Sequence, residues 1–440
     1  MLLAEIYAQS GNWMLNGPEN KGDIVVSDTD RKILREYAKK LAELAHRPLE
    51  EEKARLWAMH NDLQQTRPLF FCDPENGWNE ILRPESFQCT GALAKTWEAY
   101  LRKEIIWGEQ IRDDRVLEAT LYLPWVHHSP AMWGVDLEMH QSEQANGSYN
   151  WTPVISDFEK DMAKLRFPSI EVDAQASRLL MELGRDVFDG ILDVKRRHKW
   201  WHAQTLTRDY AELRGLETML FDFYDYPDEM HRLMGFLRDG YLHMIDYLEE
   251  HGLLSLNTGS AYVGSGGFGF TNQLPAEEFN PDHVRTIDMW NFLESQETNT
   301  VSPEFFAEFI LPYQISLAER FGLGCYGCCE PLDTRWEYVK TIPRLRRVSV
   351  SAWADVNKMA QNLGEDYVYS YKPSPSPLSS RQFNAEDHRM FFRDFLQRTA
   401  GRYSNHVEII MKDNHTLAGR PENLYSWATM IREEINRFWS

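Results

Sequence analysis

The chain has 440 residues, 43% of them hydrophobic and 26% charged, which is enough apolar material for a large core without disulfides. Its 47 basic and 67 acidic residues give a formal net charge of -20, which argues against a nucleic-acid or anionic membrane surface. No run approaches the roughly 20 apolar residues that span a bilayer, and residues 1–16 lack a basic start and a cleavage pattern. We therefore expect a cytoplasmic protein with a small-molecule substrate.

The first 66 residues predict a helical N-terminal extension. Ser27 precedes apolar residues at helical spacing from Ile33 to Leu44, and a second helix is expected over about 48–65. The short apolar run within Arg67–Asp73 then predicts the first buried strand. The expected domains are thus an extension, 1–66, and a second domain, 67–440.

From residue 67 onward, short apolar runs alternate with segments at helical spacing, of which 227–250 and 303–320 are the clearest. The predicted strands after the first are 117–125, 201–206, 253–257, 286–293, 321–328, 347–353, 367–371 and 407–411. Parallel neighbours need crossover helices, so this alternation predicts a parallel sheet. Eight or nine strands after one extension favour an α/β fold of the (β/α)8 TIM-barrel type over a doubly wound sheet.

In such a barrel the chemistry lies at the carboxyl ends of the strands. The strongest candidate there is the run from Gly324 to Pro331, in which three of the five cysteines, Cys325, Cys328 and Cys329, fall within five positions. Thiolates are natural zinc ligands, and His415 or Asp413 could complete the set. The alternative is that some of these cysteines are small buried hydrophobic residues.

Other predicted strand ends carry polar residues whose roles stay open. Lys372 could clamp a carboxylate or be an ordinary surface lysine. Glu294 and Gln296 could bind a substrate, or their segment could cap the helix that follows. The glycine-rich run 264–269 is weak evidence for phosphate and predicts a flexible loop over the barrel mouth.

Two segments resemble the uroporphyrinogen decarboxylase superfamily, which includes zinc-dependent corrinoid:thiol methyltransferases. Ser302–Phe306, followed by Phe321–Leu323 and the turn at Cys328, resembles the helix that leads into the family's His-x-Cys-Gly strand. Arg420–Leu424, shortly after Asp413–His415, resembles its closing Pro-x-Glu-Asn segment. The ligand types are exchanged, because the family's histidine falls near Cys325 or Tyr326 and its last cysteine near Asn414 or His415. The decarboxylases' arginine-rich N-terminal segment has no counterpart here, which disfavours a porphyrinogen substrate.

The resemblance implies a methyltransferase. A zinc ion would activate a thiol-type acceptor, and the methyl group would come from a corrinoid on a partner protein or from a small donor. The implied metal ligands are Cys325, Cys328, Cys329 and His415. Residues expected to orient the substrate or tune the metal are Glu294, Gln296, Lys372 and Asp413, and those expected to contact the substrate are His128, His202, Asn257, Glu330 and Trp353.

Two other functions remain open at this point. The first is a metal-independent decarboxylase or lyase acting on a small carboxylated substrate, with Lys372 and Asp413 as charge partners. The second is a non-catalytic barrel that binds a corrinoid or another aromatic ligand through its abundant tryptophans and tyrosines.

Overall fold

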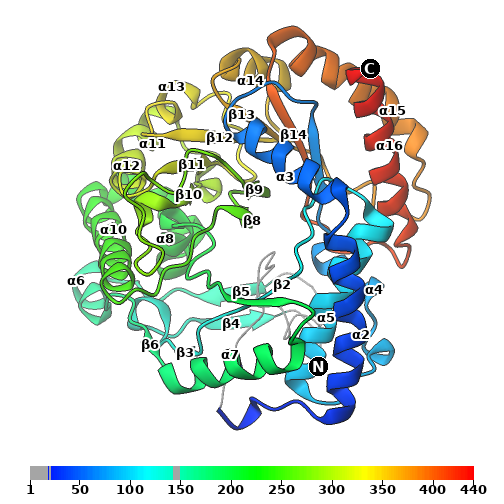
Figure 1. The fold of residues 1–440 in the computed structure, drawn as a ribbon. Coiled ribbons are helices and arrows are strands. Elements are labelled where there is room, and N and C mark those ends of the chain that lie inside the picture. The colour runs from blue at the N-terminus through cyan, green and yellow to red at the C-terminus, as the bar shows by residue number, and fades with distance from the viewer. Residues whose placement is uncertain (1–17, 19–20, 142–148) are drawn as a thin grey trace.

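The computed structural model describes Pro18, residues 21–141 and residues 149–440 (Figure 1). The expectation for residues 1–16 therefore lies outside the described residues. The strands in chain order are β1 (Leu69–Cys72), β2 (Thr120–Leu123), β3 (His127–His128), β4 (Glu138–Gln141), β5 (Tyr149–Thr152), β6 (Glu171–Val172), β7 (Asp193–Arg196), β8 (Gly259–Val263), β9 (Gly267–Gly269), β10 (Trp290–Leu293), β11 (Leu323–Tyr326), β12 (Leu345–Ser351), β13 (Val368–Lys372) and β14 (His406–Met411).

Helices cover the outside of the strands (Figure 1). They are α2 (Asp28–Ala45), α3 (Pro48–Asn61), α4 (Trp78–Ile81), α5 (Ala92–Ile106), α6 (Phe158–Asp161), α7 (Ala174–Phe188), α8 (Leu206–Arg214), α9 (Leu216–Asp225), α10 (Pro227–Glu250), α11 (Pro303–Phe309), α12 (Leu311–Ala318), α13 (Trp336–Val339), α14 (Val356–Leu363), α15 (Ala385–Leu396) and α16 (Glu422–Trp439). No helix within the described ranges is long and apolar enough to cross a membrane.

The main sheet is parallel and has the order β1-β14-β13-β12-β11-β10. Its first and last strands along the chain are neighbours, with Phe70 opposite Ile409. Strands β2 and β7 form a separate parallel pair. The α/β class is thus confirmed, but the hydrogen bonds between the described strands do not close the predicted eight-stranded barrel.

Most strands of the main sheet were visible in the sequence because they are buried on both faces and read as short apolar runs. The predicted strand 201–206 is wrong, since this segment is irregular until α8 begins at Leu206. The prediction 253–257 is also wrong: that segment has no strand partner. The predicted helix 303–320 is divided in two: α11 ends at Phe309 and α12 begins at Leu311, with Ile310 between them.

The N-terminal helices pack against the rest of the molecule. Ser27 caps α2, its hydroxyl accepting a hydrogen bond from the Asp30 amide at 3.1 Å. One face of α2 is fully buried through Leu34, Ala38 and Leu41, the i, i+4, i+7 pattern of a helix on a core, and α2 lies beside α5 (Figure 1). Both predicted helices are confirmed, while a domain boundary at residue 66 stays a prediction.

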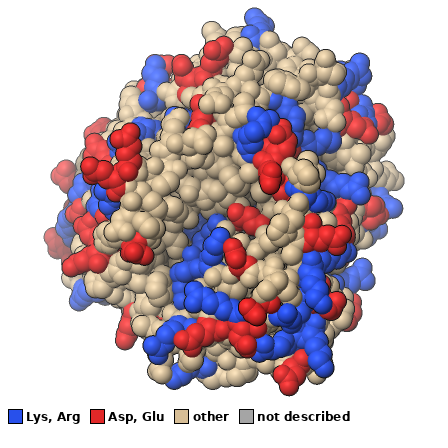
Figure 2. All heavy atoms as spheres, in the orientation of Figure 1, with Lys and Arg blue, Asp and Glu red and all other residues tan. Residues whose placement is uncertain are grey.

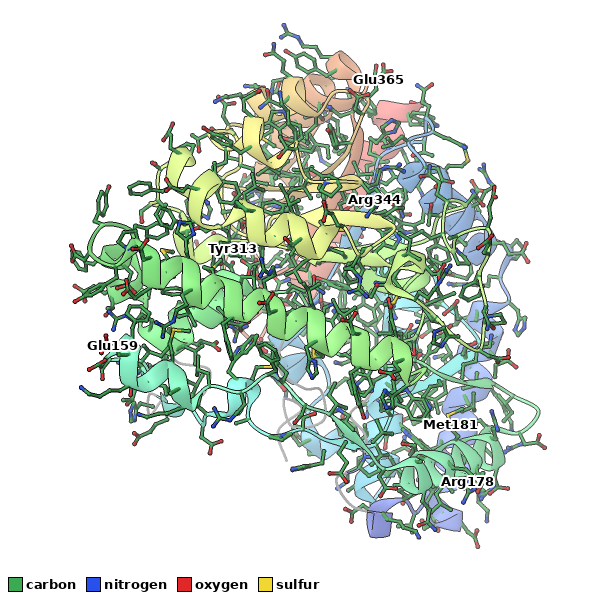
Figure 3. All side chains as sticks on the ribbon, turned by 90° about the vertical axis from the view of Figure 1, so that its left-hand side faces the viewer. Glu159, Arg178, Met181, Tyr313, Arg344 and Glu365 are labelled. Carbon is green, nitrogen blue, oxygen red and sulfur yellow. The ribbon has the colours of Figure 1, made fainter. Side chains whose placement is uncertain are left out.

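The long helix α10 and the shorter α12 pack side by side on one flank of the molecule. His231 Nδ1 on α10 lies 2.9 Å from the hydroxyl of Tyr313 on α12, which Figure 3 labels. The same view shows α7 with Met181 and Arg178. Met181 is buried and Arg178 lies on the surface, which is the division expected of an amphipathic helix.

The glycine-rich segment 264–269 is a buried turn and strand, so the predicted flexible loop is wrong. Strands β8 and β9 form an antiparallel hairpin that packs against the inner face of the main sheet. Gly266 has a φ of +106°, and a Cβ there would meet Ile410 at 2.4 Å. At Gly267 a Cβ would lie 2.6 Å from the Arg347 guanidinium carbon. Glycine is required here because the hairpin backbone approaches the sheet so closely.

A buried charge network lies under this hairpin. Arg347 Nε on β12 lies 3.0 Å from Glu408 Oε1 on β14, and both side chains are at most 2% exposed. His60 Nε2 lies 3.4 Å from the other carboxylate oxygen, and Ser370 donates to Oε1. Burial alone would raise the pKa of Glu408, but Arg347 and His60 lower it to about 2. The face of the sheet under the hairpin is therefore polar, and its two buried charges, Arg347 and Glu408, are paired with each other.

Candidate active site

Two cysteines and a lysine meet at the carboxyl edge of the main sheet. Cys328 and Cys329 follow β11, and Lys412 and Asp413 follow β14. The Nζ atom of Lys412 lies 3.5 Å from Cys328 Sγ and 3.4 Å from Asp413 Oδ1. Cys329 Sγ is 3.8 Å from Cys328 Sγ and 4.0 Å from Asp413 Oδ2. Parallel strands place these four side chains together although 84 residues separate them along the chain.

The β8–β9 hairpin contributes a fifth group to this cluster. Ser265, at its turn, is buried, and its hydroxyl donates to Cys328 Sγ at 3.5 Å. Lys412 Nζ donates to the same hydroxyl at 3.0 Å. The hydroxyl and the ammonium thus both approach one sulfur atom, which is an environment that favours a thiolate.

The electrostatics of Cys328 follow from these contacts. The Cys329 thiol lowers the pKa of Cys328, burial opposes this, and the Lys412 ammonium with the Ser265 hydroxyl adds to the lowering, to about 6. The pKa of Cys329 is raised, because its proton is shared with the neighbouring sulfur. Burial disfavours a charged Lys412, but Cys328 and Asp413 raise its pKa. At neutral pH the pair is therefore a thiolate and an ammonium.

Two buried glutamates, Glu330 and Glu294, interact with Cys328. Glu330 accepts hydrogen bonds from the Cys328 amide at 2.8 Å and the Ser295 amide at 2.9 Å, and so joins the turns after β11 and β10. Glu294 is 2% exposed, and burial together with the charges of Glu297, Glu330 and Cys328 raises its pKa well above the ordinary value. One of its carboxyl oxygens has no hydrogen-bond partner among the described residues. A protonated Glu294 could donate a proton beside the sulfur.

A pH-dependent alkylation rate is expected from this geometry. Iodoacetamide should modify Cys328 with a rate that rises through a midpoint near pH 6, well below the ordinary 9.0, because only the thiolate reacts. Lys412→Met should move the midpoint upward, since it removes the positive charge 3.5 Å from the sulfur. Peptide mass spectrometry across pH measures this, and Cys329 serves as the internal control. A Cys328 midpoint near 9 in the unmodified chain would contradict the arrangement.

The predicted zinc ligands do not come together as a set. Cys325 is buried and faces Arg347, whose Nη1 lies 3.6 Å from its sulfur, while His415 is exposed. Among the described residues, no group of three or more His, Cys, Asp or Glu side chains has the arrangement of a metal site. The position beside Cys328 is instead filled by Lys412. The residues present therefore do not fit a zinc site.

Four other predicted site residues are occupied in different ways. Lys372 donates to Ser370, beside Glu408, and does not reach Asp413. Asn257 holds the Trp290 backbone through two hydrogen bonds of 2.8 Å. The remaining two are Gln296, whose backbone amide donates to Glu294 Oε2 at 3.0 Å, and His202, which lines a separate cavity.

The last predicted residues are at the surface. His128, His415 and Trp353 are exposed, Trp353 by 80%. His128 lies in the short strand β3, where it is paired with Glu171 of β6. The structure brings none of these three to the Cys328 cluster. Their predicted roles in metal or substrate binding stay untested.

The comparisons with known proteins do not identify the reaction. No family model matches the chain, and no curated protein matches it. Among solved structures, a methyltransferase from Methanosarcina mazei is similar with a TM-score of 0.46 and 9% sequence identity, covering 88% of this chain and 98% of that one. The sequence resemblance to the uroporphyrinogen decarboxylase superfamily therefore stays a prediction.

Proposed function

We propose that the protein is a group-transfer enzyme in which the Cys328 thiolate is the nucleophile. The observation that carries this proposal is the contact of Cys328 Sγ with Lys412 Nζ at 3.5 Å and with the Ser265 hydroxyl at 3.5 Å. A cysteine of lowered pKa is a good nucleophile at neutral pH and also a good leaving group. These are the two properties that a carrier of a transferred group needs.

The transferred group in this proposal is a methyl group, as the sequence resemblance implies. The thiolate attacks the methyl carbon of a small donor; a sulfur–carbon bond forms, the bond to the donor breaks, and its electron pair leaves with the donor. Glu294 can supply a proton to that leaving group. The acceptor then attacks the same carbon with its own electron pair, and Cys328 leaves as a thiolate.

The second half of this cycle restricts the acceptor. A thioether holds its methyl group firmly, so the acceptor must be more nucleophilic than a thiol. A reduced corrinoid, presented by a partner protein, is the class that meets this requirement. The sequence resemblance implied such a partner as the methyl donor, and this proposal gives it the role of acceptor. Lys412 assists by stabilising the thiolate as it departs.

Covalent labelling tests the proposal. The full chain, mixed with S-adenosylmethionine as the small methyl donor, is expected to gain the mass of one methyl group in place of one proton, located on Cys328. Cys328→Ser should take up none, and Cys329→Ser should still be labelled. Labelling that persists in Cys328→Ser, or a chain that stays unmodified by the donor, would overturn the role of Cys328 as methyl carrier.

The lyase alternative receives no support from the contacts of its predicted charge partners. Lys372 is buried beside Ser370 and Glu408, whereas Asp413 pairs with Lys412. Decarboxylation of a small carboxylated substrate stays a prediction of the sequence alone.

A further inference from the structure

A cavity apart from the Cys328 cluster lies along the unpaired edge of β10. It measures about 1010 Å³ including its solvent-open part, and aromatic side chains such as Tyr262, Trp200 and Trp290 line it. Arg197, Lys199 and His202, from the segment after β7, line it as well. Figure 2 shows basic side chains gathered at the lower wall of the hollow in the middle of this face. Glu104, which pairs with Arg115, and Glu118, which accepts from the Ser260 hydroxyl, also line the cavity, so its lining is aromatic and carries both signs of charge.

Lys199 has an unusual environment for a lysine. Its Nζ atom lies 2.8 Å from His202 Nδ1 and 5.4 Å from the centroid of the Tyr262 ring. Within the described ranges, no carboxylate lies at ion-pair distance from this amine, whereas the nearby surface Lys195 is 57% exposed and 3.4 Å from Asp193. Burial lowers the pKa of Lys199 to about 7, so much of it is a free amine at neutral pH.

Arg197 offers the positive charge that Lys199 loses when it is neutral. Its Nη1 donates to Ser260 Oγ at 3.3 Å, and its guanidinium carbon lies 3.3 Å from the centroid of the Tyr122 ring. Like Lys199, it forms no ion pair with any described carboxylate. A guanidinium in this position can bind a carboxylate with paired hydrogen bonds.

We propose that Lys199 is a nucleophilic amine that forms an imine with a small 2-oxo acid whose carboxylate is bound by Arg197. The amine lone pair attacks the carbonyl carbon, a carbon–nitrogen bond forms, and the carbonyl oxygen takes up a proton. Loss of that hydroxyl as water, together with the one proton that remains on the nitrogen, gives the imine. His202, in contact with Nζ, carries the proton between nitrogen and oxygen. A desolvated lysine in an apolar pocket is a known route to such chemistry.

Imine formation at Lys199 needs no thiol, so this proposal does not depend on the role of Cys328. The cavity and the thiolate nevertheless share the β8–β9 hairpin, since Gly264 lines the cavity and the next residue, Ser265, donates to Cys328. The Cys328→Ser variant is therefore the background in which imine formation is separated from group transfer. Imine formation should persist there unchanged.

Reductive trapping tests the proposal. The full chain is incubated with pyruvate, reduced with sodium cyanoborohydride and mapped by peptide mass spectrometry. One adduct on Lys199 is expected, with none at that position in Lys199→Met or in Lys199→Arg. Lys199→Arg keeps a basic side chain at this position. Circular dichroism of both variants shows whether they fold. Lys195→Met is the matched control and should be labelled on Lys199 like the unmodified chain.

The role of Arg197 has its own comparison. Arg197→Gln should reduce trapping of pyruvate about tenfold, the effect of one lost charge-assisted interaction, and leave trapping of acetone unchanged. Absence of a Lys199 adduct, or labelling spread equally over Lys195 and other surface lysines, would overturn the proposal. If Arg197→Gln reduced the trapping of pyruvate and of acetone equally, Arg197 would not bind the carboxylate of the 2-oxo acid.

Discussion

Cys328→Ser is expected to lower kcat/KM for methyl transfer by at least about 10³-fold, because a serine hydroxyl in the same position stays protonated and is a poor nucleophile. The Lys412 ammonium, 3.5 Å from the sulfur, can stabilise a thiolate but lacks the strength to ionise an alcohol at neutral pH. The measurement is the initial rate of methyl transfer from the donor that labels Cys328.

Cys89→Ser is the matched control for that variant. Cys89 is also buried, but its sulfur lies 4.0 Å from the carbonyl oxygen of Asp30, in the first turn of α2. Its rate should equal that of the unmodified chain within a factor of about two, provided that both variants unfold at similar denaturant concentrations. A Cys328→Ser variant that retains the full rate would remove the thiolate from the mechanism.

The main sheet could be predicted because its strands are buried on both faces. Runs such as Leu69–Cys72 read as continuous apolar segments between helical ones. Strand β7, Asp193–Arg196, was missed because its side chains are exposed or half-buried and the sequence there is mostly charged. The segment 201–206 misled for the opposite reason: its tryptophan, Trp201, is apolar, but it lines a cavity instead of a strand face.

The site could be predicted only in part. Position at a strand end identified Cys328, Cys329, Glu294 and Asp413, since the filter needs only the order of strands. It missed Lys412, although Glu408 and Ile410 of β14 and Lys412 just after it fall on one face at the period of two expected for a strand. That alternation is the sequence signal that could have identified Lys412 as a residue of the site.

Two other features of the site had no signal of that kind. The contact between Ser265 and Cys328 joins positions 63 residues apart through a buried hairpin. The glycines of that hairpin suggested flexibility, yet they are there because side chains of the sheet leave no room for a Cβ. Sequence spacing alone cannot distinguish these two uses of glycine.

Glu408→Gln is expected to lower the free energy of unfolding by about 3–5 kcal/mol, because it leaves the Arg347 guanidinium buried without a counter-charge. The carboxylate is fully buried, 3.0 Å from Arg347 Nε and 3.4 Å from His60 Nε2. Urea denaturation at pH 7 measures the loss. Glu337→Gln is the matched control, because Glu337 forms an exposed pair with Lys340 and should change stability by less than about 1 kcal/mol.

The pH dependence and the double variant make this prediction specific. The folded pKa of Glu408, about 2, lies below its ordinary 4.5, so its stabilisation is fully present above pH 4.5 and is lost as pH falls toward 2. Glu408→Gln should therefore be less sensitive to acid over that window than the unmodified chain. Replacing Arg347 by Met in the same chain should recover part of the loss, since no unpaired charge then remains. Additive losses from the two substitutions would show that the pair contributes nothing as a pair.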